Sequence, residues 1–233
     1  MGAVVGGAGP TTEPFFADVG DVSDRLRATG YLADDATATS TFLADRLGKP
    51  LLVEGPAGVG KTELARAIAT ATDAELIRLQ CYEGIDEARA LYEWNHAKQI
   101  LHIQATGSRA WEEAKTDIFS DEFLLPRPLL KAISREGRTV LLIDEVDKAD
   151  VDMEGLLLEV LSDFAITIPE MGTVAAARRP VVLLTSNATR ELSDALKRRC
   201  LYHWIDYPSR EREAEIVRAR LPGVPEAVAD RAL

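Results

Sequence analysis

Short apolar runs recur along the chain, separated by stretches of helical periodicity. The runs lie at 51–54, 75–79, 139–143, 181–185 and 201–205. Runs rich in Val, Leu and Ile, such as VLLID and VVLLT, are typical of strands that are buried on both faces. Strands that alternate with helices indicate right-handed βαβ units. The pattern therefore predicts an α/β fold with a five-stranded, mostly parallel sheet between helices.

The regions outside these runs suggest a domain organisation. Residues 1–20 are rich in Gly, Ala and Pro and lack periodicity, which predicts a mobile N-terminal tail. Helical patterns at 21–29 and 35–47 precede the first strand. A nucleotide-binding core is thus expected over 21–207. The charged helical pattern EREAEIVRARL, followed by Pro-Gly and a last short helix, predicts the start of a small helical lid over 208–233.

Composition and charge indicate which classes of binding partner the chain can have. Apolar residues make up 46% and charged residues 28%, as in ordinary globular proteins. The formal net charge of -11 opposes extended nucleic-acid binding, and the basic clusters are short. Two distant cysteines, Cys81 and Cys200, are expected to be reduced thiols. With no membrane-length apolar run and no secretory signal pattern, the expected location is cytoplasmic.

The segment GPAGVGKT matches the phosphate-loop pattern G-x-x-x-x-G-K-[ST] in full. In such a loop, glycines let backbone amides point at phosphate oxygens, and the following helix adds partial positive charge. Lys61 is expected to reach the β- and γ-phosphates, and Thr62 to bind Mg²⁺. A chance glycine-rich turn is disfavoured, because a predicted strand precedes the segment and a predicted helix follows it. The residues expected at the nucleotide are Gly55, Pro56, Ala57, Gly58, Val59, Gly60, Lys61, Thr62 and Glu63.

Two acidic residues follow the third apolar run. The segment VLLIDEVDKAD places Asp144 and Glu145 at the C-terminal end of a predicted strand, where open α/β sheets bind ligands. Asp144 is expected to hold Mg²⁺, and Glu145 to orient or deprotonate an attacking water. A solvated acidic turn is the alternative, disfavoured because the pair follows a buried strand. The adjacent Glu favours water as the acceptor.

Polar residues after the fourth run and before the fifth complete the candidate site. Asn187 could hydrogen-bond the γ-phosphate or the lytic water, although Asn after a strand is commonly a turn residue. Arg198 and Arg199 end a predicted helix, where cations also suit the helix dipole. Their functional interpretation is an arginine finger offered to the γ-phosphate of a neighbouring subunit. If the site is shared between subunits in this way, the protein must assemble with further copies of itself to be active.

These four elements, in this order, resemble an AAA+ ATPase core of the P-loop NTPase type over roughly residues 30–225. The stretches GYLADDATATSTFLADRLGKPLLVEGPAGVGKTE, LYEWNHAKQILHI and LTSNATRELSDALKRRCLYHWIDYP resemble the MoxR branch, and most closely the CoxD-like ATPases. The resemblance matches the Walker A positions to Lys61 and Thr62, Walker B to Asp144 and Glu145, sensor 1 to Asn187, and the finger to Arg199, with Arg198 second.

The resemblance implies ATP and Mg²⁺ as cofactors and self-association into a ring, typically a hexamer. It implies a chaperone-like ATPase that remodels a protein client, namely a metalloenzyme such as a carbon monoxide dehydrogenase or another molybdenum enzyme. It places Tyr31, Leu32 and Ala33 against adenine, with simple helix packing as an equal alternative. The family's sensor 2 arginine lies on a third lid helix. This chain ends after two predicted lid helices, so it is read as a fragment or as lacking that function.

Two other functions stay open. The chain could be a nucleotide-gated interaction module with little turnover, because its lid is incomplete. It could also be a DNA-associated AAA+ protein such as a clamp-loader subunit, which Arg-Cys at the finger position suggests. The acidic balance and the lack of a basic stripe argue against nucleic acid as a partner.

Two segments are candidates for contacting a client. Residues 82–128 are long for a connection between strands and are predicted to form an insert facing a ring pore or client. The segment 166–182 predicts a hairpin that turns near Met171-Gly172. Packing between subunits is the alternative for both. His96 and His102 in the insert are six residues apart, which does not place them on one helix face, so no metal site is expected there.

Overall fold

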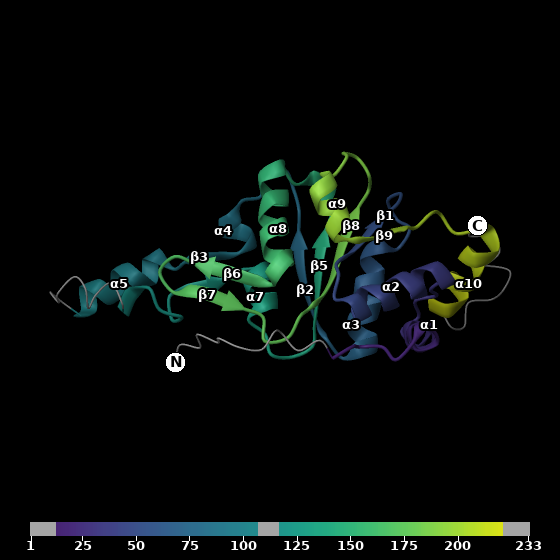
Figure 1. The fold of residues 1–233 in the computed structure, drawn as a ribbon, viewed down its shortest axis with the longest axis horizontal. Helices are drawn as coiled ribbons and strands as arrows, with labels where there is room; N and C mark the ends of the chain where they lie inside the picture. The colour runs from purple at the N-terminus through teal and green to yellow at the C-terminus, as the bar shows by residue number, and fades with distance from the viewer. Residues whose placement is uncertain (1–12, 107–116, 221–233) are drawn as a thin grey trace.

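The computed structural model describes residues 13–106 and 117–220, which are arranged around a five-stranded sheet (Figure 1). The strand order is β2-β5-β8-β1-β9, and all the pairings are parallel. The predicted α/β fold with its five-stranded parallel sheet is confirmed. The strands are β1 (Leu51–Glu54), β2 (Glu75–Gln80), β5 (Thr139–Asp144), β8 (Val181–Ser186) and β9 (Leu201–Trp204).

Helices cover both faces of the sheet. One face packs on α1 (Val19–Ala28), α2 (Asp35–Leu47) and α3 (Lys61–Thr72), and the other on α7 (Pro128–Ile133), α8 (Val151–Asp163) and α9 (Asp194–Arg199). Alternate residues of β5 belong to the two sides: Val140 and Leu142 pack toward α3, whereas Leu141 and Ile143 pack toward α7 and α8. Burial on both faces explains the continuous apolar run of β5.

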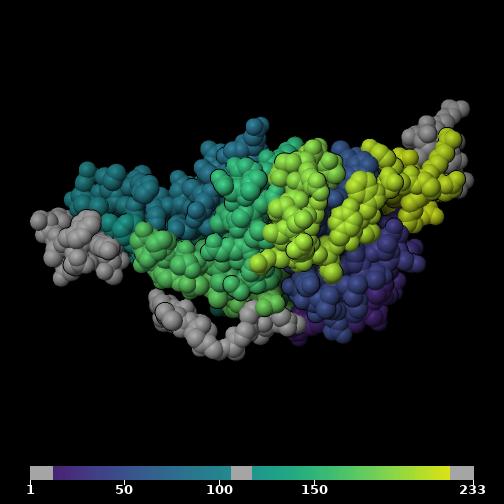
Figure 2. Space-filling model, turned by 45° about the horizontal axis from the view of Figure 1, so that its top comes forward, coloured from purple at the N-terminus to yellow at the C-terminus, as the bar shows by residue number. Residues whose placement is uncertain are grey.

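The predicted insert contains α4 (Glu87–Ala90), β3 (Tyr92–Trp94), α5 (His96–Thr106) and β4 (Leu124–Pro126). Strand β3 pairs antiparallel with β4, apart from the main sheet. The insert projects from one end of the molecule, with α5 outermost among its described elements (Figures 1 and 2). Strands β6 (Ala165–Ile168) and β7 (Gly172–Ala175) pair antiparallel and confirm the predicted hairpin.

The prediction of a mobile tail through residue 20 is wrong for residues 13–20. Phe15 and Phe16 are buried in the cluster that contains α1, α2 and α3. The Asp45 carboxylate accepts hydrogen bonds from their two backbone amides, at 2.7 and 3.0 Å. Asp18 then caps α1, which begins at Val19. The prediction rested on the Gly-rich composition of residues 1–20. The two adjacent phenylalanines were the feature of this region that indicated burial. Residues 1–12 lie outside the described residues.

The described C-terminal segment ends in α10 (Arg210–Arg220), at the opposite end of the molecule from the insert (Figure 1). The second predicted lid helix falls in 221–233, outside the described residues. In the described part of the chain, no helix combines the length and apolarity that a membrane span needs.

Candidate functional site

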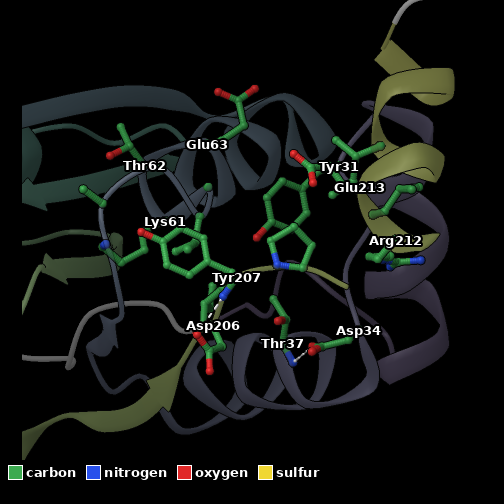
Figure 3. Close-up of a pocket in the computed structure, with 18 of the residues that line it drawn as sticks. Tyr31, Asp34, Thr37, Lys61, Thr62, Glu63, Asp206, Tyr207, Arg212 and Glu213 are labelled. Carbon is green, nitrogen blue, oxygen red and sulfur yellow. Dashed lines mark hydrogen bonds between the residues drawn. The ribbon is translucent and has the colours of Figure 1, made fainter. Parts of the chain in front are cut away.

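A pocket of about 850 Å³ brings together segments from across the sequence (Figure 3). Its lining includes the phosphate loop from Ala57, the residues after β5 and β8, and one side of α10. The loop that connects α1 to α2 contributes Tyr31 and Leu32. Its size and mixed lining are those of a cofactor-sized pocket.

Two glycines give the phosphate loop its shape. At Gly55 the backbone passes close to Ile205, which directly follows β9. A Cβ at this position would lie 1.9 Å from the Ile205 carbonyl oxygen. Gly60 has φ +97° and is the N-cap residue of α3, where it has no side chain to accept a capping hydrogen bond. The first amides of α3 therefore have no side-chain acceptor, and they fit an anionic phosphate at this end of the helix.

Lys61 is the buried cation of the pocket. Its ammonium donates to the carbonyl oxygens of Gly55 and Pro56, at 2.7 and 2.6 Å, and to Asn187 Oδ1 at 2.8 Å. Burial lowers the Lys61 pKa, and the neighbouring carboxylates oppose that shift. All three N–H donors are occupied. A phosphate oxygen that bonds to Lys61 would have to replace one of these acceptors. Asn187, as one of them, would then lie beside the phosphate.

Thr62 and Asp144 meet beside Lys61. The Thr62 hydroxyl donates to Asp144 Oδ1 at 3.0 Å, and the Thr185 hydroxyl donates to the same oxygen. Asp144 is buried and its Oδ2 accepts from Arg78 Nε at 2.9 Å. Hydroxyl and carboxylate oxygens are the hard donors that Mg²⁺ prefers. The donor set thus fits the predicted metal.

Glu145 adopts a left-handed backbone conformation, with φ +56°. Its amide donates to Thr185 Oγ1 at 2.9 Å, which ties the turn to β8. Its Oε2 accepts hydrogen bonds from Gln80 Nε2 and from Lys148 Nζ, both at 2.8 Å. The Oε2 atom of the carboxylate is thereby held by residues from β2 and from the turn after β5.

The segment after β8 is bonded to the segment after β5. The buried Asp147 accepts hydrogen bonds from the Thr189 amide and hydroxyl, at 3.1 and 2.6 Å. Burial would raise the Asp147 pKa, but these hydrogen bonds lower it below its usual value. Arg190 adds an ion pair with Glu154 on α8, at 2.6 Å. These bonds hold the backbone around Asn187 against the turn that carries Glu145.

Aromatic residues and α10 form the other end of the pocket. Tyr31 and Tyr207 both point into it in Figure 3, and Trp204 also lines it. Burial raises the Tyr31 pKa well above its usual range, so its phenol stays neutral. Arg212 of α10 donates to the Ala33 carbonyl oxygen at 3.2 Å. Helix α10 is therefore bonded to the loop where the sequence placed adenine contacts.

A second contact joins α10 to the phosphate loop. Arg220, at the end of the helix, pairs with Glu63 in the first turn of α3, at 3.1 Å. Both residues line the pocket. Glu63 was among the residues predicted at the nucleotide, whereas Arg220 was not.

The predicted site residues are not all in one place. Gly55 and Pro56 do not line the pocket and reach it only through their bonds to Lys61. Arg198 and Arg199 lie outside it and are exposed at the end of α9. Arg199 Nη1 donates to the Leu158 carbonyl oxygen of α8 at 3.4 Å. Neither arginine is positioned to act on a phosphate held by its own chain.

Several residues in and around the pocket were not predicted from the sequence. Those of greatest consequence in the lining are Trp204, Tyr207, Arg212 and Arg220. Arg78, Gln80 and Asp147 lie outside the lining and are bonded to Asp144, Glu145 and Thr189. Arg78 and Gln80 had a detectable signal, because they are polar positions two apart in the apolar run ELIRLQ and so share one face of a strand. The remaining residues follow or precede the predicted motifs in the sequence. They form no pattern of their own that would have marked them as site residues.

The cysteines and histidines form no further site within the described residues. Cys81 and Cys200 are free, and burial raises the pKa of each thiol to about 12. His96 Nδ1 lies 3.0 Å from Gln99 Oε1. Residues 13–106 and 117–220 contain no group of three or more His, Cys, Asp or Glu that could hold a metal ion.

Residues 50–200 match the family model for the AAA domain (dynein-related subfamily). The chain belongs to this family. The chain is 32% identical over 173 residues to chaperone protein ClpB 1 of Nostoc sp., covering 73% of this AAA domain chain and 16% of that protein. It is also 32% identical over 186 residues to chaperone protein ClpB of Corynebacterium diphtheriae, covering 76% of the chain and 18% of that protein.

A solved structure of a candidate ATPase from Cytophaga hutchinsonii has the same fold. The TM-score is 0.55 at 18% identity, over 89% of this AAA domain chain and 55% of that one. At this identity the likeness concerns the fold alone. The chain spans less than a fifth of the length of the two ClpB relatives.

Proposed function

We propose that this AAA domain binds ATP with Mg²⁺ and hydrolyses the γ-phosphate with water. The observation that carries the proposal is the convergence of three distant motifs on one pocket. Lys61 of the phosphate loop bonds to Asn187 after β8, and Thr62 bonds to Asp144 after β5. The residues proposed to contact the cofactor and the metal therefore lie near Glu145, the proposed base.

Each residue would contribute a separate part of the reaction. Lys61 binds the phosphates, and Asn187 is placed beside it to orient the γ-phosphate or the attacking water. Thr62 and Asp144 would hold Mg²⁺, which when bound neutralises charge on the phosphates. Glu145 would accept the proton of water at a carboxylate oxygen.

We infer that the catalytic site is completed by a second copy of the chain. Arg198 and Arg199 are exposed at the end of α9 and away from their own pocket. AAA+ proteins commonly form hexameric rings, in which such an arginine reaches the nucleotide of the adjacent subunit. Helix α10 would then be the first helix of a lid over 208–233, following a core over 21–207.

We further propose that ATP hydrolysis remodels a protein client. The support is the similarity to proteins named chaperones, and the stretches that resemble MoxR and CoxD-like ATPases. A metalloenzyme, for example one that contains molybdenum, is the client class that the latter resemblance favours. The projecting insert with α5 and the β6-β7 hairpin are the candidate contact surfaces.

Mg²⁺-dependent ATP turnover per subunit, measured over a range of protein concentrations, tests this function. Turnover should rise with concentration and should fall at least about 100-fold in Glu145→Gln, which retains ATP binding. Arg199→Ala should also lose turnover, with Arg135→Ala as a control on an arginine that does not line the pocket. Tight ATP binding with negligible turnover at every concentration would instead support a nucleotide-gated module.

A further inference from the structure

Arg78 reaches the metal-site carboxylate from the edge of the sheet. In the register of β2 and β5, Arg78 lies opposite Leu142, and Gln80 lies opposite Asp144. Alternation along the two strands puts these side chains on the face that packs against α3. The guanidinium therefore approaches Asp144 from the side opposite β8.

The two oxygens of Asp144 have different partners. Oδ1 accepts from the hydroxyls of Thr62 and Thr185, whereas Oδ2 accepts from Arg78 Nε and Nη2, at 2.9 and 2.5 Å. The Asp144 side chain is 3% exposed, but that of Arg78 is 44% exposed. A buried carboxylate needs a compensating charge. In the protein without metal, Arg78 supplies it.

We propose that Arg78 is a positioning residue that competes with Mg²⁺ for Asp144, and so sets the Mg²⁺ concentration at which nucleotide binds tightly. The inference rests on the proposed ATP–Mg²⁺ function. A positive charge beside a divalent-cation site weakens cation binding, and two cations that share one carboxylate oppose each other reciprocally. Because Arg78 is partly exposed, its guanidinium can turn to water when the metal arrives.

The test is the Mg²⁺ dependence of binding of a fluorescent ATP analogue. The variants are Arg78→Met and, as a matched control, Arg135→Met. Arg135 pairs with Glu75 at the other end of β2, so its removal changes the net charge equally but far from the site. The half-saturating Mg²⁺ concentration should fall about fivefold or more in Arg78→Met and stay at the wild-type value in Arg135→Met.

Thermal unfolding without metal provides a second readout. Arg78→Met should melt below wild type, because Asp144 loses its counter-charge. Addition of Mg²⁺ and the analogue should raise its melting temperature more than that of wild type. Arg78→Gln removes the same charge with a polar side chain and gives the same test where Arg78→Met does not fold.

The outcomes separate this inference from the proposed function. Wild type that binds with Mg²⁺, together with an unchanged or higher half-saturating concentration in the Arg78 variants, would overturn the competition and leave the ATPase proposal standing. Wild type that binds no analogue at any Mg²⁺ concentration would overturn the proposed function and the inference with it.

Discussion

Alanine substitutions at two glycines of the phosphate loop should differ sharply in cost. Both positions have positive φ, +153° at Gly55 and +88° at Gly58. A Cβ at Gly58 would meet no atom within 4 Å, whereas one at Gly55 would lie 1.9 Å from the Ile205 carbonyl oxygen. That obstacle is backbone, and the Ile205 amide is itself bonded to the Glu54 carbonyl oxygen at 2.8 Å. It cannot yield without moving the end of β9.

The magnitudes follow from these contacts. Gly58→Ala should cost about 1–2 kcal/mol of unfolding free energy, from backbone strain alone. Gly55→Ala should carry a similar strain and a further ~1–3 kcal/mol for the clash. At about 2–4 °C per kcal/mol for a domain of this size, the melting temperature should fall by about 2–8 °C for Gly58→Ala and about 4–20 °C for Gly55→Ala.

Thermal and urea unfolding of the nucleotide-free protein, followed by circular dichroism, measure this difference directly. Comparison of the two variants with each other removes uncertainty about the wild-type stability. A Gly55→Ala variant as stable as Gly58→Ala would refute the reasoning, because it would mean that the loop does not pass this close to Ile205.

Two further predictions concern the core and a buried histidine. Phe16→Ala should lower the unfolding free energy by about 3–5 kcal/mol, since Phe16 is 2% exposed, while Leu47→Ala, at a residue 55% exposed, should change it little; equal urea midpoints for the two variants would contradict the burial of the N-terminal segment. His203 is buried with Nε2 2.9 Å from Thr37 Oγ1, and burial lowers its pKa below the ordinary 6.5, against the opposing charge of Asp34. Because the fold favours neutral His203, its stabilisation is complete above the ordinary pKa and is lost as the pH falls below it. Melting temperatures between about pH 7.5 and 5.5 should therefore fall more steeply in wild type than in His203→Gln, and parallel curves would show that His203 is not the group responsible.

Local pattern was sufficient for the architecture and for the centre of the site. Strands buried on both faces leave continuous apolar runs, so β5 and β8 were predicted to within a residue of their observed ends. The phosphate loop depends on residues adjacent in the chain, and its glycines and Lys61 could be read from spacing alone. Asp144 and Glu145 were recognisable because they directly follow a buried strand.

The tertiary structure decided which distant residues meet. The bond between Lys61 and Asn187 joins positions 126 residues apart, and the contact of Arg78 with Asp144 joins positions 66 apart. Both depend on the strand order and on the register of β2 against β5, which local periodicity does not encode. The burial of Phe16 and the bond between Arg212 and the α1–α2 loop arise in the same way. The sequence by itself thus determined the main strands and the phosphate-loop motif, because both depend on residues adjacent in the chain. Packing determined the partners that hold those groups in place.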